Sequence, residues 1–340
     1  MSLKKKAVTI KDIAERTGFS ANTVSRALRN KEDISIETRE KIHEIAKQMG
    51  YVNNTLAASL RLGYTNTIAV ILGDVSNPHF AIMMKEIEIH ARGHGYASFL
   101  LNTNEDEELE FAAIKAALEK NVDGIIICPT QKSEKNLEFL RKSGVPFVLI
   151  GRRHPDYNNV VCNDEQGGYL ATKALLEAGH ERILLLLGPT YISSARERLE
   201  GYRRAYREAG IPVFEQLIRE VEVTSQNVQD VLTQLEKEGE TYTAIFAFSD
   251  MLAWSAWNCL SRQGKSVPKD CSLVGFDNIQ SRMSLPFALT SIKSYKGRMS
   301  TETVELLVRQ IRGNEETEQM VIDTALAEGE TITAPRTQDA

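Results

Sequence analysis

From Thr67 to about residue 313, this 340-residue chain alternates short apolar runs with amphipathic stretches. The runs are roughly five to eight residues long and show no strict alternation of apolar and polar positions. Such runs are typical of strands that are buried on both faces of a parallel sheet. The runs are TIAVILGDV (67–75), YASFLLNT (96–103), DGIIICPT (123–130), PFVLIGR (146–152), ERILLLLGP (181–189), TAIFAFSD (243–250) and CSLVGFD (271–277).

The alternation is longer than one doubly wound sheet needs, so it predicts two open α/β lobes with parallel sheets. In the stretch 250–263, apolar residues recur at helical spacing, with Asp250 as the expected cap at the start and Gly264 at the end. Ligands of such folds bind at the carboxyl ends of the strands. We therefore expect functional side chains directly after the apolar runs.

The first 62 residues differ in charge from the rest. They carry 12 lysines and arginines against seven aspartates and glutamates, although the whole chain has a net charge of −5. All nine prolines lie at or after Pro78, which leaves this head free to form short helices. A small basic head on a large acidic body indicates a polyanionic partner at one end of the chain.

Two short helices with a tight turn between them are expected in the head. Thr9 and Asp12 form a start that resembles a capping box. Gly18 is suited to end the first helix in a left-handed conformation, and Ser20 is suited to cap the second. This arrangement is a helix-turn-helix unit, whose second helix fits the major groove of DNA, although a plain solvated helix is the alternative. The polar face of the second helix comprises Ala21, Asn22, Thr23, Ser25, Arg26 and Arg29.

The segment TIKDIAERTGFSANTVSRALRN (9–30) resembles the DNA-binding head of the lac repressor/galactose repressor family of bacterial transcription regulators. The resemblance continues through IETREKIHEIAKQMGY (36–51), similar to the family's third helix, and then covers essentially the whole chain. It implies two lobes that resemble periplasmic sugar-binding proteins. The implied domains are a small all-α helix-turn-helix head at 1–50, a hinge at 51–63, and an effector-binding and dimerisation domain at 64–340.

By this resemblance, the second helix supplies the residues that contact DNA. Ala21, Asn22 and Arg26 occupy the base-reading positions, and Ser20, Thr23 and Ser25 would hold phosphates. Asn reads adenine and Arg reads guanine by paired hydrogen bonds, whereas Ala21 is small enough to contact only a thymine methyl group.

Within the hinge, the stretch suited to form a helix, which Asn53 or Asn54 could cap and Gly63 could end, has under about ten residues, fewer than the roughly 12–15 that an isolated helix needs. We expect it to be frayed without DNA and to fold beside a second hinge in a homodimer, a plain linker being the alternative. Leu60 matches the leucine that wedges between bases in the minor groove in this family. Asn53 and Ala58 replace the family's usual proline and arginine, which would weaken this contact.

Polar residues and an aromatic ring follow the apolar runs of the body, as expected for a site that binds a polyhydroxylated ligand, a sugar or sugar derivative. By resemblance, Arg198 clamps the effector, Asp277 is its acidic ligand, and His79 and Phe80 line the first lobe. Further candidates are Asn163, Asp164 and Ser249. The alternatives are a surface ion pair for Arg198, a cap for Asp277 and a core position for Phe80. Arg152 and Arg153 could favour an anionic sugar acid or phosphate, or could be solvated surface.

The sequence offers little support for an enzyme, a metalloprotein, a membrane protein or a secreted protein. We expect no enzyme, cofactor or metal site, because the motifs bring together no paired carboxylates, nucleophile or metal ligands. The chain has no apolar run of membrane-spanning length and no secretory signal, and its four cysteines are widely spaced, so a cytoplasmic protein without a membrane partner is expected. The predicted function is a homodimeric transcription regulator, with repression as the default, that binds operator DNA under the control of a small effector. The alternative is a sugar-binding protein without a DNA function.

Overall fold

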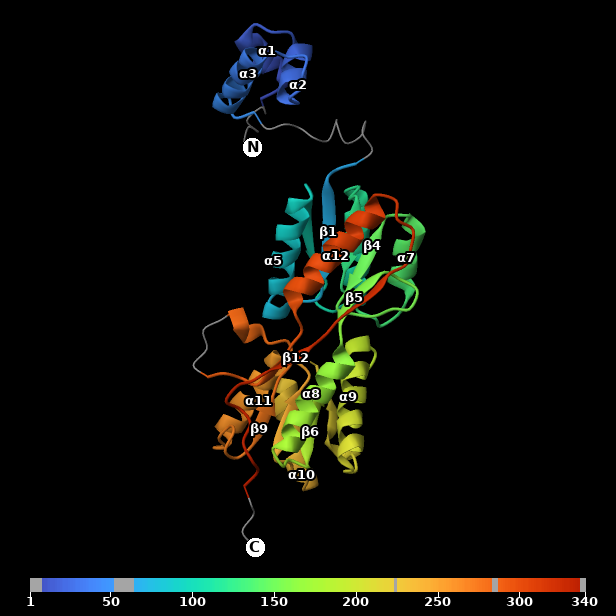
Figure 1. Cartoon of the computed structure of the whole chain (residues 1–340), viewed down its shortest axis with the longest axis vertical. Coiled ribbons are helices and arrows are strands. Elements are labelled where there is room, and N and C mark those ends of the chain that lie inside the picture. Colours follow the sequence, from blue (N-terminus) through green and yellow to red (C-terminus); the bar gives the residue numbers. More distant parts are fainter. Residues whose placement is uncertain (1–7, 52–63, 223–224, 283–286, 337–340) are drawn as a thin grey trace, which may run out of the picture. The chain divides into compact units, whose positions relative to one another are not determined.

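The computed structural model describes residues 8–51, 64–222, 225–282 and 287–336. It divides the chain into two units, Met1–Thr65 and Asn66–Ala340, which we call the head and the body (Figure 1). The predicted hinge residue Leu60, with residues 52–63, lies outside the described residues. No helix among the described residues is long and apolar enough to cross a membrane.

The head contains three short helices around a small core. Thr9 and Asp12 form the predicted capping box at the first helix, and Gly18 ends that helix with a φ of 76°. Ser20 caps the second helix by accepting a hydrogen bond from the Thr23 backbone N–H. These observations confirm the local predictions for the helix-turn-helix unit. The helices are α1 (Ile10–Thr17), α2 (Ala21–Leu28) and α3 (Ile36–Gln48), and the buried core comprises Ile13, Val24, Ala27, Ile42 and Ala46.

The first lobe of the body, here the N-lobe, is a parallel six-stranded sheet in the order β11-β5-β4-β3-β1-β2. Helices α5 and α12 pack together on one face of the sheet, and α6 and α7 cover the other (Figure 1). The strands are β1 (Thr67–Leu72), β2 (Ala97–Asn102), β3 (Gly124–Ile127), β4 (Phe147–Ile150), β5 (Asn159–Cys162) and β11 (Gln319–Ile322). The helices are α5 (Pro78–Gly93), α6 (Glu107–Glu119), α7 (Lys135–Ser143) and α12 (Lys296–Ile311).

The second lobe, the C-lobe, is a parallel four-stranded sheet in the order β7-β6-β8-β9. Helices α8 and α9 cover one face, and α10 and α11 cover the other. The strands are β6 (Ile183–Leu187), β7 (Ile218–Glu220), β8 (Ala244–Ala247) and β9 (Ser272–Val274). The helices are α8 (Asp164–Glu177), α9 (Ser193–Ala209), α10 (Ser225–Glu238) and α11 (Asp250–Arg262), with the 3₁₀ turns η1 (Glu215–Leu217) and η2 (Ile279–Arg282).

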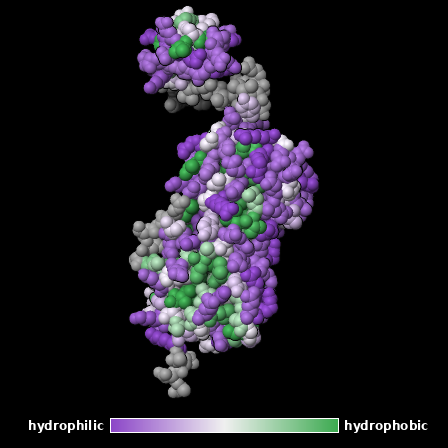
Figure 2. Space-filling model, in the orientation of Figure 1, coloured by the Kyte–Doolittle hydropathy of each residue, from purple (hydrophilic) through white to green (hydrophobic). Residues whose placement is uncertain are grey.

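The chain crosses between the lobes three times: from β5 to α8, from β10 (Ser291–Lys293) to α12, and from β11 to β12 (Ala325–Ala327). β10 and β12 pair as an antiparallel ribbon at the middle of the body (Figure 1). The body thus consists of two doubly wound lobes joined by several crossings, which confirms the predicted fold class. In this arrangement the carboxyl ends of the strands of the two lobes face each other. In the view of Figure 2, hydrophilic residues cover most of both units, and hydrophobic residues gather in patches on the C-lobe.

One local prediction was wrong: Asp250 does not cap α11. The cap is Ser249, whose side chain accepts a hydrogen bond from the Leu252 backbone N–H. Asp250 is the first helical residue, and its buried carboxylate points instead to the loop that follows β9. The error arose because Ser and Asp are both good caps, and only the path of the neighbouring strand decides between them.

Candidate functional site

Arg198 lies on α9, at the junction of the lobes, and all but 7% of its side chain is buried. Its Nε is 2.8 Å from Asp164 Oδ1, and its Nη1 donates to the carbonyl of Phe248. The guanidinium also stacks on the ring of Phe276, with 3.5 Å from its Cζ to the ring centroid. Burial opposes the charge of Arg198, but the carboxylates of Asp164 and Asp277 raise its pKa overall. The guanidinium is therefore a fixed cation with Nη2 turned toward Asp277.

Close packing of two helices brings Arg198 and Asp164 together. Helices α8 and α9 meet backbone to backbone: a Cβ on Gly168 would lie 2.3 Å from the Arg198 carbonyl oxygen. A Cβ on Gly201 would likewise lie 2.0 Å from the carbonyl oxygen of Glu165. These glycines let Asp164, the first residue of α8, reach the guanidinium of Arg198. Burial raises the pKa of Asp164 to about 6 despite the opposing effect of Arg198.

Asp277 follows β9 in a strained backbone conformation, with a φ of 98°. Its Oδ1 lies 3.3 Å from His79 Nδ1, a contact without hydrogen-bond geometry, and 4.0 Å from Arg198 Nη2. Its carbonyl oxygen accepts a hydrogen bond from Lys296 Nζ. Burial opposes ionisation, but the nearby His79, Arg198 and Lys296 hold the pKa of Asp277 below its usual value. His79 and Lys296 belong to N-lobe helices, so Asp277 connects the two lobes.

Asp250 holds the loop that presents Asp277. Its Oδ2 accepts from the Ile279 backbone N–H at 2.8 Å, and its Oδ1 accepts from Ser291 Oγ at 2.6 Å. Ser291 Oγ also accepts from the backbone N–H of Asn278, at 3.0 Å. Burial, followed by the charge of Asp277, raises the pKa of Asp250 to about 7. This role was not predicted; its signal in the sequence was the pair Ser249-Asp250 at a strand end.

The remaining predicted residues lie around this cluster. Phe80 is 9% exposed and packs in the core, with its ring edge to face with His79 at 5.2 Å between centroids. Asn163 caps α8 by accepting from the Gln166 backbone N–H at 3.1 Å, and Ser249 caps α11. The structure thus brings His79, Asp164, Arg198 and Asp277 into one network, which we call the cleft cluster. Asn163 and Ser249 lie at strand ends with their side-chain oxygens accepting the cap hydrogen bonds.

Further polar contacts join the lobes at the start of α9. The N-lobe residue Gln131 accepts from the Ser193 backbone N–H at 2.8 Å. Arg153 forms a two-bond ion pair with Glu197, at 2.8 and 3.3 Å. Arg152 is buried and ion-paired with Glu105 at 2.8 Å. Both arginines that could have favoured an anionic effector are therefore already paired with carboxylates of the chain.

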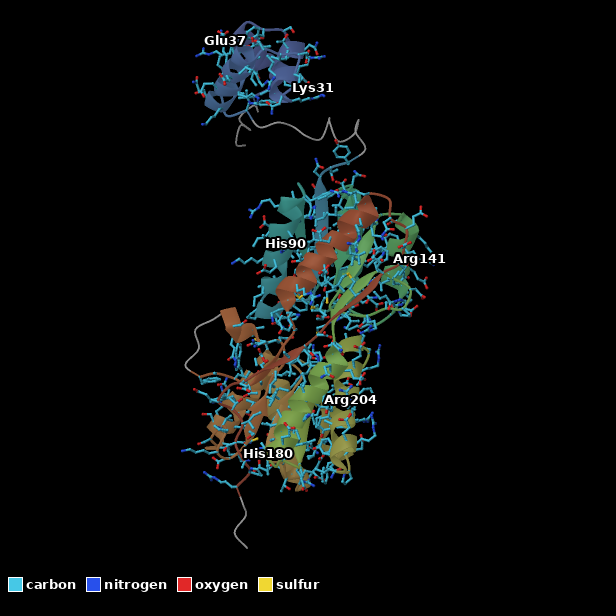
Figure 3. The ribbon with its side chains drawn as sticks, viewed as in Figure 1. Lys31, Glu37, His90, Arg141, His180 and Arg204 are labelled. Atoms are coloured by element: carbon cyan, nitrogen blue, oxygen red, sulfur yellow. The ribbon has the colours of Figure 1, made fainter. Side chains whose placement is uncertain are left out.

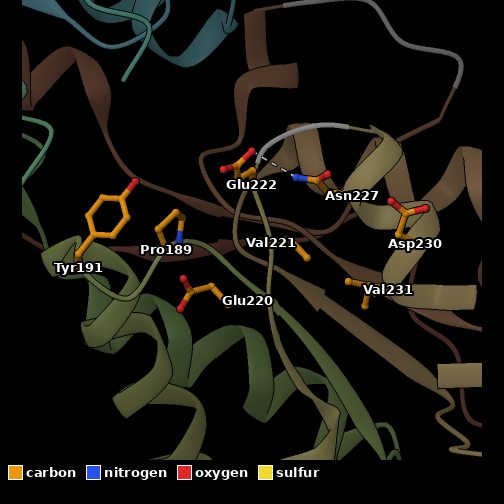
Figure 4. A pocket seen from close by; sticks show the side chains of 8 residues that line it. All are labelled: Pro189, Tyr191, Glu220, Val221, Glu222, Asn227, Asp230 and Val231. Carbon is orange, nitrogen blue, oxygen red and sulfur yellow. Dashed lines mark hydrogen bonds between the residues drawn. The ribbon is translucent and has the colours of Figure 1, made fainter. Parts of the chain in front are cut away.

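A pocket of ≈ 580 Å³ opens at the carboxyl ends of β6 and β7. Figure 4 shows the carboxylates of Glu220, Glu222 and Asp230 around it, with Tyr191 at one side. Glu220 accepts a hydrogen bond from the Thr190 backbone N–H at 3.1 Å, and Asn227 donates to Glu222 at 3.4 Å. The three carboxylates make this pocket acidic.

His90 and His94, four residues apart in sequence, both pair with residues of α12. His90 Nε2 lies 2.8 Å from Thr301 Oγ1, and His94 Nε2 lies 2.7 Å from Glu305 Oε1. Each histidine therefore ties α5 to α12. Among the residues that the structure describes, His, Cys, Asp and Glu form no group suited to hold a metal ion.

In the head, the predicted DNA-contacting residues occupy one helix. Ala21, Asn22 and Arg26 are exposed, whereas Thr23 and Ser25 are half-buried. Ser20 Oγ lies 2.9 Å from Thr23 Oγ1, so these two hydroxyls are hydrogen-bonded to each other. Arg26 is ion-paired with Asp33, a contact that the sequence did not suggest.

A helix-turn-helix unit followed by a two-lobed unit with a buried polar cluster between the lobes defines a DNA-binding regulator with a ligand-sensing domain. Residues 9–54 match the family model described as bacterial regulatory proteins, lacI family. Residues 65–329 match the model described as periplasmic binding proteins and sugar binding domain of LacI family. The chain therefore belongs to the LacI family and is a DNA-binding transcriptional repressor of that family.

Two curated relatives are similar over most of their length. The chain is 31% identical to the transcriptional repressor PurR of Actinobacillus pleuropneumoniae serotype 3 (strain JL03) over 306 residues, covering 89% of this chain and 91% of the relative. It is 33% identical to the transcriptional regulator DegA of Bacillus subtilis (strain 168) over 320 residues, covering 92% and 94%. Both relatives are transcription regulators rather than enzymes.

Solved structures share the fold. The Lac repressor bound to ONPG in the repressed state superposes with a TM-score of 0.84 and 25% identity, over 96% of this chain and 100% of that one. A LacI family regulator from Enterococcus faecium with bound ribose has a TM-score of 0.70 and 26% identity, over 80% and 100%. The transcriptional regulator CelR in complex with cellobiose has a TM-score of 0.72 and 26% identity, over 95% and 99%.

Proposed function

We propose that this chain is a homodimeric, cytoplasmic repressor whose affinity for operator DNA is set by a neutral polyhydroxylated effector, a sugar or sugar derivative. The proposed domains are a DNA reader at 1–50, a hinge at 51–63 and an effector-binding domain at 64–340. The observation that carries the proposal is the cleft cluster, in which Asp277 and Arg198 of the C-lobe face His79 of the N-lobe. A ligand at this junction contacts both lobes and so favours one arrangement of them over another.

The charges around the cluster support a neutral ligand. Arg198 is paired with Asp164, while Arg152 and Arg153 are paired with glutamates. The pocket at the carboxyl ends of β6 and β7 presents three carboxylates as well. At the cluster, an anionic ligand would meet arginines that are already paired with carboxylates and would be repelled by Asp164 and Asp277. Vicinal hydroxyl groups suit the site better, because they both donate to Asp277 and accept from Arg198 Nη2.

In this proposal, Arg198 and Asp277 bind effector hydroxyls, and His79 and Phe80 form the N-lobe side of the site. Asp164 holds Arg198, while Asn163 and Ser249 present the helix starts beside it. In the head, Asn22 and Arg26 read bases, Ala21 contacts a thymine methyl group, and Ser20, Thr23 and Ser25 bind phosphates. Leu60 is proposed as the minor-groove wedge.

Effector binding is tested by thermal melting of the full-length protein with D-ribose, cellobiose, D-gluconate and ribose 5-phosphate. We expect a neutral sugar to raise the melting temperature and to change the affinity for a duplex selected from a randomised pool. Arg198→Ala should abolish both responses. The matched control is Arg203→Ala on the same helix, which faces Glu215 on the surface. Stabilisation by the anionic probes alone would contradict the choice of a neutral ligand.

The homodimer is proposed to use the edge of the N-lobe. Strand β2 lies at the edge of its sheet, and a mainly apolar groove of ≈ 350 Å³ runs between it and α5. Ile89 on α5 is also 41% exposed, and exposed apolar surface of this kind is typical of subunit contacts. The groove is lined by Val75, Ala81, Met84, Lys85, Glu88 and Leu100. Light scattering should show a dimer for the native protein and a monomer for Leu100→Asp; two equally dimeric proteins would exclude this face.

A further inference from the structure

Arg26, the proposed guanine reader on α2, is in direct contact with an acidic residue of the same head unit. Its Nη2 pairs with Asp33 Oδ2, and the two side chains remain 46% and 50% exposed. The hydrogen bond raises the pKa of Arg26 and lowers that of Asp33. Because exposed ion pairs contribute little to folding stability, the main consequence of this pair is the position of the guanidinium.

Asp33 lies in a short turn whose shape is fixed by its own hydrogen bonds. The Lys31 backbone N–H donates to the Arg26 carbonyl at 3.1 Å, which ties the turn to the end of α2. Arg39 Nη2, from α3, donates to the carbonyls of Lys31 and Ile34, both at 3.1 Å. Lys31 and Glu37, on either side of this turn, are labelled in Figure 3. The carboxylate of Asp33 is therefore held beside the C-terminal end of the proposed recognition helix.

We propose that Asp33 is a specificity-determining residue that orients Arg26 for guanine. This inference rests on the proposed function, in which α2 is the recognition helix. A guanidinium has five N–H donors in a rigid plane, so one edge can bind a carboxylate while the other binds guanine O6 and N7. An arginine held in this way loses less side-chain freedom when it binds the base.

The negative charge of Asp33 also favours specific over non-specific binding of DNA. Non-specific binding to DNA depends on attraction between cations and the phosphates, and a carboxylate on the DNA-binding face weakens that attraction. Specific binding is weakened less, because the oriented Arg26 compensates at its base pair. Asp33 therefore increases the ratio of specific to non-specific affinity rather than the affinity itself.

The test is a double-mutant cycle in the full-length protein with Arg26→Ala, Asp33→Asn and the double variant. Fluorescence anisotropy measures binding to three probes: a duplex selected from a randomised pool, its single base-pair substitutions, and a random duplex. The matched control is Glu32→Gln, which removes the same charge one residue earlier in the exposed turn. Asp33→Glu serves as the conservative variant, and circular dichroism verifies the fold of each protein.

We expect Arg26→Ala to identify one base pair at which discrimination is lost. At that base pair, Asp33→Asn should lower discrimination by about 3–10-fold, within the range that a bidentate arginine contact provides. Asp33→Glu should restore part of it, and Glu32→Gln should leave it unchanged. Both charge-removing variants should bind the random duplex more tightly. In the Arg26→Ala background, Asp33→Asn should no longer affect discrimination.

Three results would contradict either the recognition-helix assignment or the role of Asp33, and the experiment distinguishes them. If Arg26→Ala changes neither affinity nor discrimination, the recognition-helix assignment in the proposed function is wrong. If Arg26→Ala costs discrimination but Asp33→Asn does not, Asp33 has no orienting role, although the proposed function stands. If Asp33→Asn changes base preference equally with and without Arg26, then Asp33 reads a base by itself and the inference is wrong.

Discussion

Asp277 Oδ1 lies 3.3 Å from His79 Nδ1, although the two residues are almost 200 positions apart in sequence and belong to different lobes. The backbone carbonyl of Asp277 is also bound by Lys296, at the start of an N-lobe helix. Any ligand that competes for the Asp277 carboxylate must therefore change a contact between the lobes. This relationship gives the effector site a direct way to alter lobe closure.

The first prediction concerns the Asp277 carboxylate. Asp277→Asn should weaken effector binding by roughly 10–150-fold, because a hydrogen bond to a charged group contributes about 1.5–3 kcal/mol. DNA binding without effector should change little, because the contact of Lys296 to the backbone carbonyl of residue 277 remains in this variant. Calorimetric titration with the sugar identified by thermal melting measures the affinity. Unchanged affinity would exclude Asp277 as an effector ligand.

The second prediction concerns the buried pair of Asp164 and Arg198. Asp164→Ala should lower the free energy of unfolding by about 3–5 kcal/mol, because it leaves a buried guanidinium without its closest carboxylate. Urea denaturation provides the measurement. Glu165→Ala is the control: its carboxylate is paired with Arg204 at a half-exposed position, so its loss should cost about 1 kcal/mol or less. Similar losses for both variants would argue against a tightly buried pair.

The third prediction concerns pH. The pKa of Asp250 is raised to about 7 by burial and by Asp277, from 3.8 in the unfolded chain. Between these values the folded state binds a proton that the unfolded state releases, so Asp250 makes stability fall as pH rises. The fall should be roughly 2 kcal/mol between about pH 5.5 and about pH 7.5. Asp250→Asn should flatten this part of the denaturation profile; a profile of the same slope would contradict the assignment.

The fourth prediction concerns the contact between α8 and α9. Gly201→Ala should destabilise the body by at least about 1–3 kcal/mol, because the new Cβ would lie 2.0 Å from the Glu165 carbonyl oxygen and push the helices apart. The same shift should weaken effector binding by moving Arg198. Gly93→Ala, near the end of α5 with no atom within 4 Å of the new Cβ, should change stability little. Chemical denaturation of both variants measures the free energy of unfolding. Equal values for the two variants would contradict a stabilising role of the close helix contact.

Local sequence was sufficient to predict much of the fold. The capping box of Thr9 and Asp12, the left-handed Gly18 and the cap at Ser20 all follow from interactions within three or four residues. The apolar runs likewise indicated parallel strands and therefore two α/β lobes. Such predictions succeed because hydrogen bonding and apolar periodicity act over short distances along the chain.

The site was harder to predict. The resemblance indicated which residues lie at the cleft, but not which of them bind each other. Burial of Asp164 against Arg198, and the use of Asp250 to hold the loop after Asp277, depend on how α8, α9 and α11 pack. The same is true of Arg152 and Arg153, whose charges are paired with carboxylates that lie 44 or more positions away along the chain.

Sequence reasoning alone predicted the helix caps of the head, seven of the strands that the structure describes, the order of a basic helical head and two α/β lobes, and the residue types at the strand ends. The partners of the charged groups came from the folded structure: Asp33 for Arg26, Asp164 for Arg198, and groups of both lobes for Asp277. The difference lies in how far apart in sequence the interacting residues are. Helix caps and strand patterns are set by immediate neighbours in sequence, whereas the energy of a charged side chain depends on burial and on charges that other turns, helices and strands bring close to it.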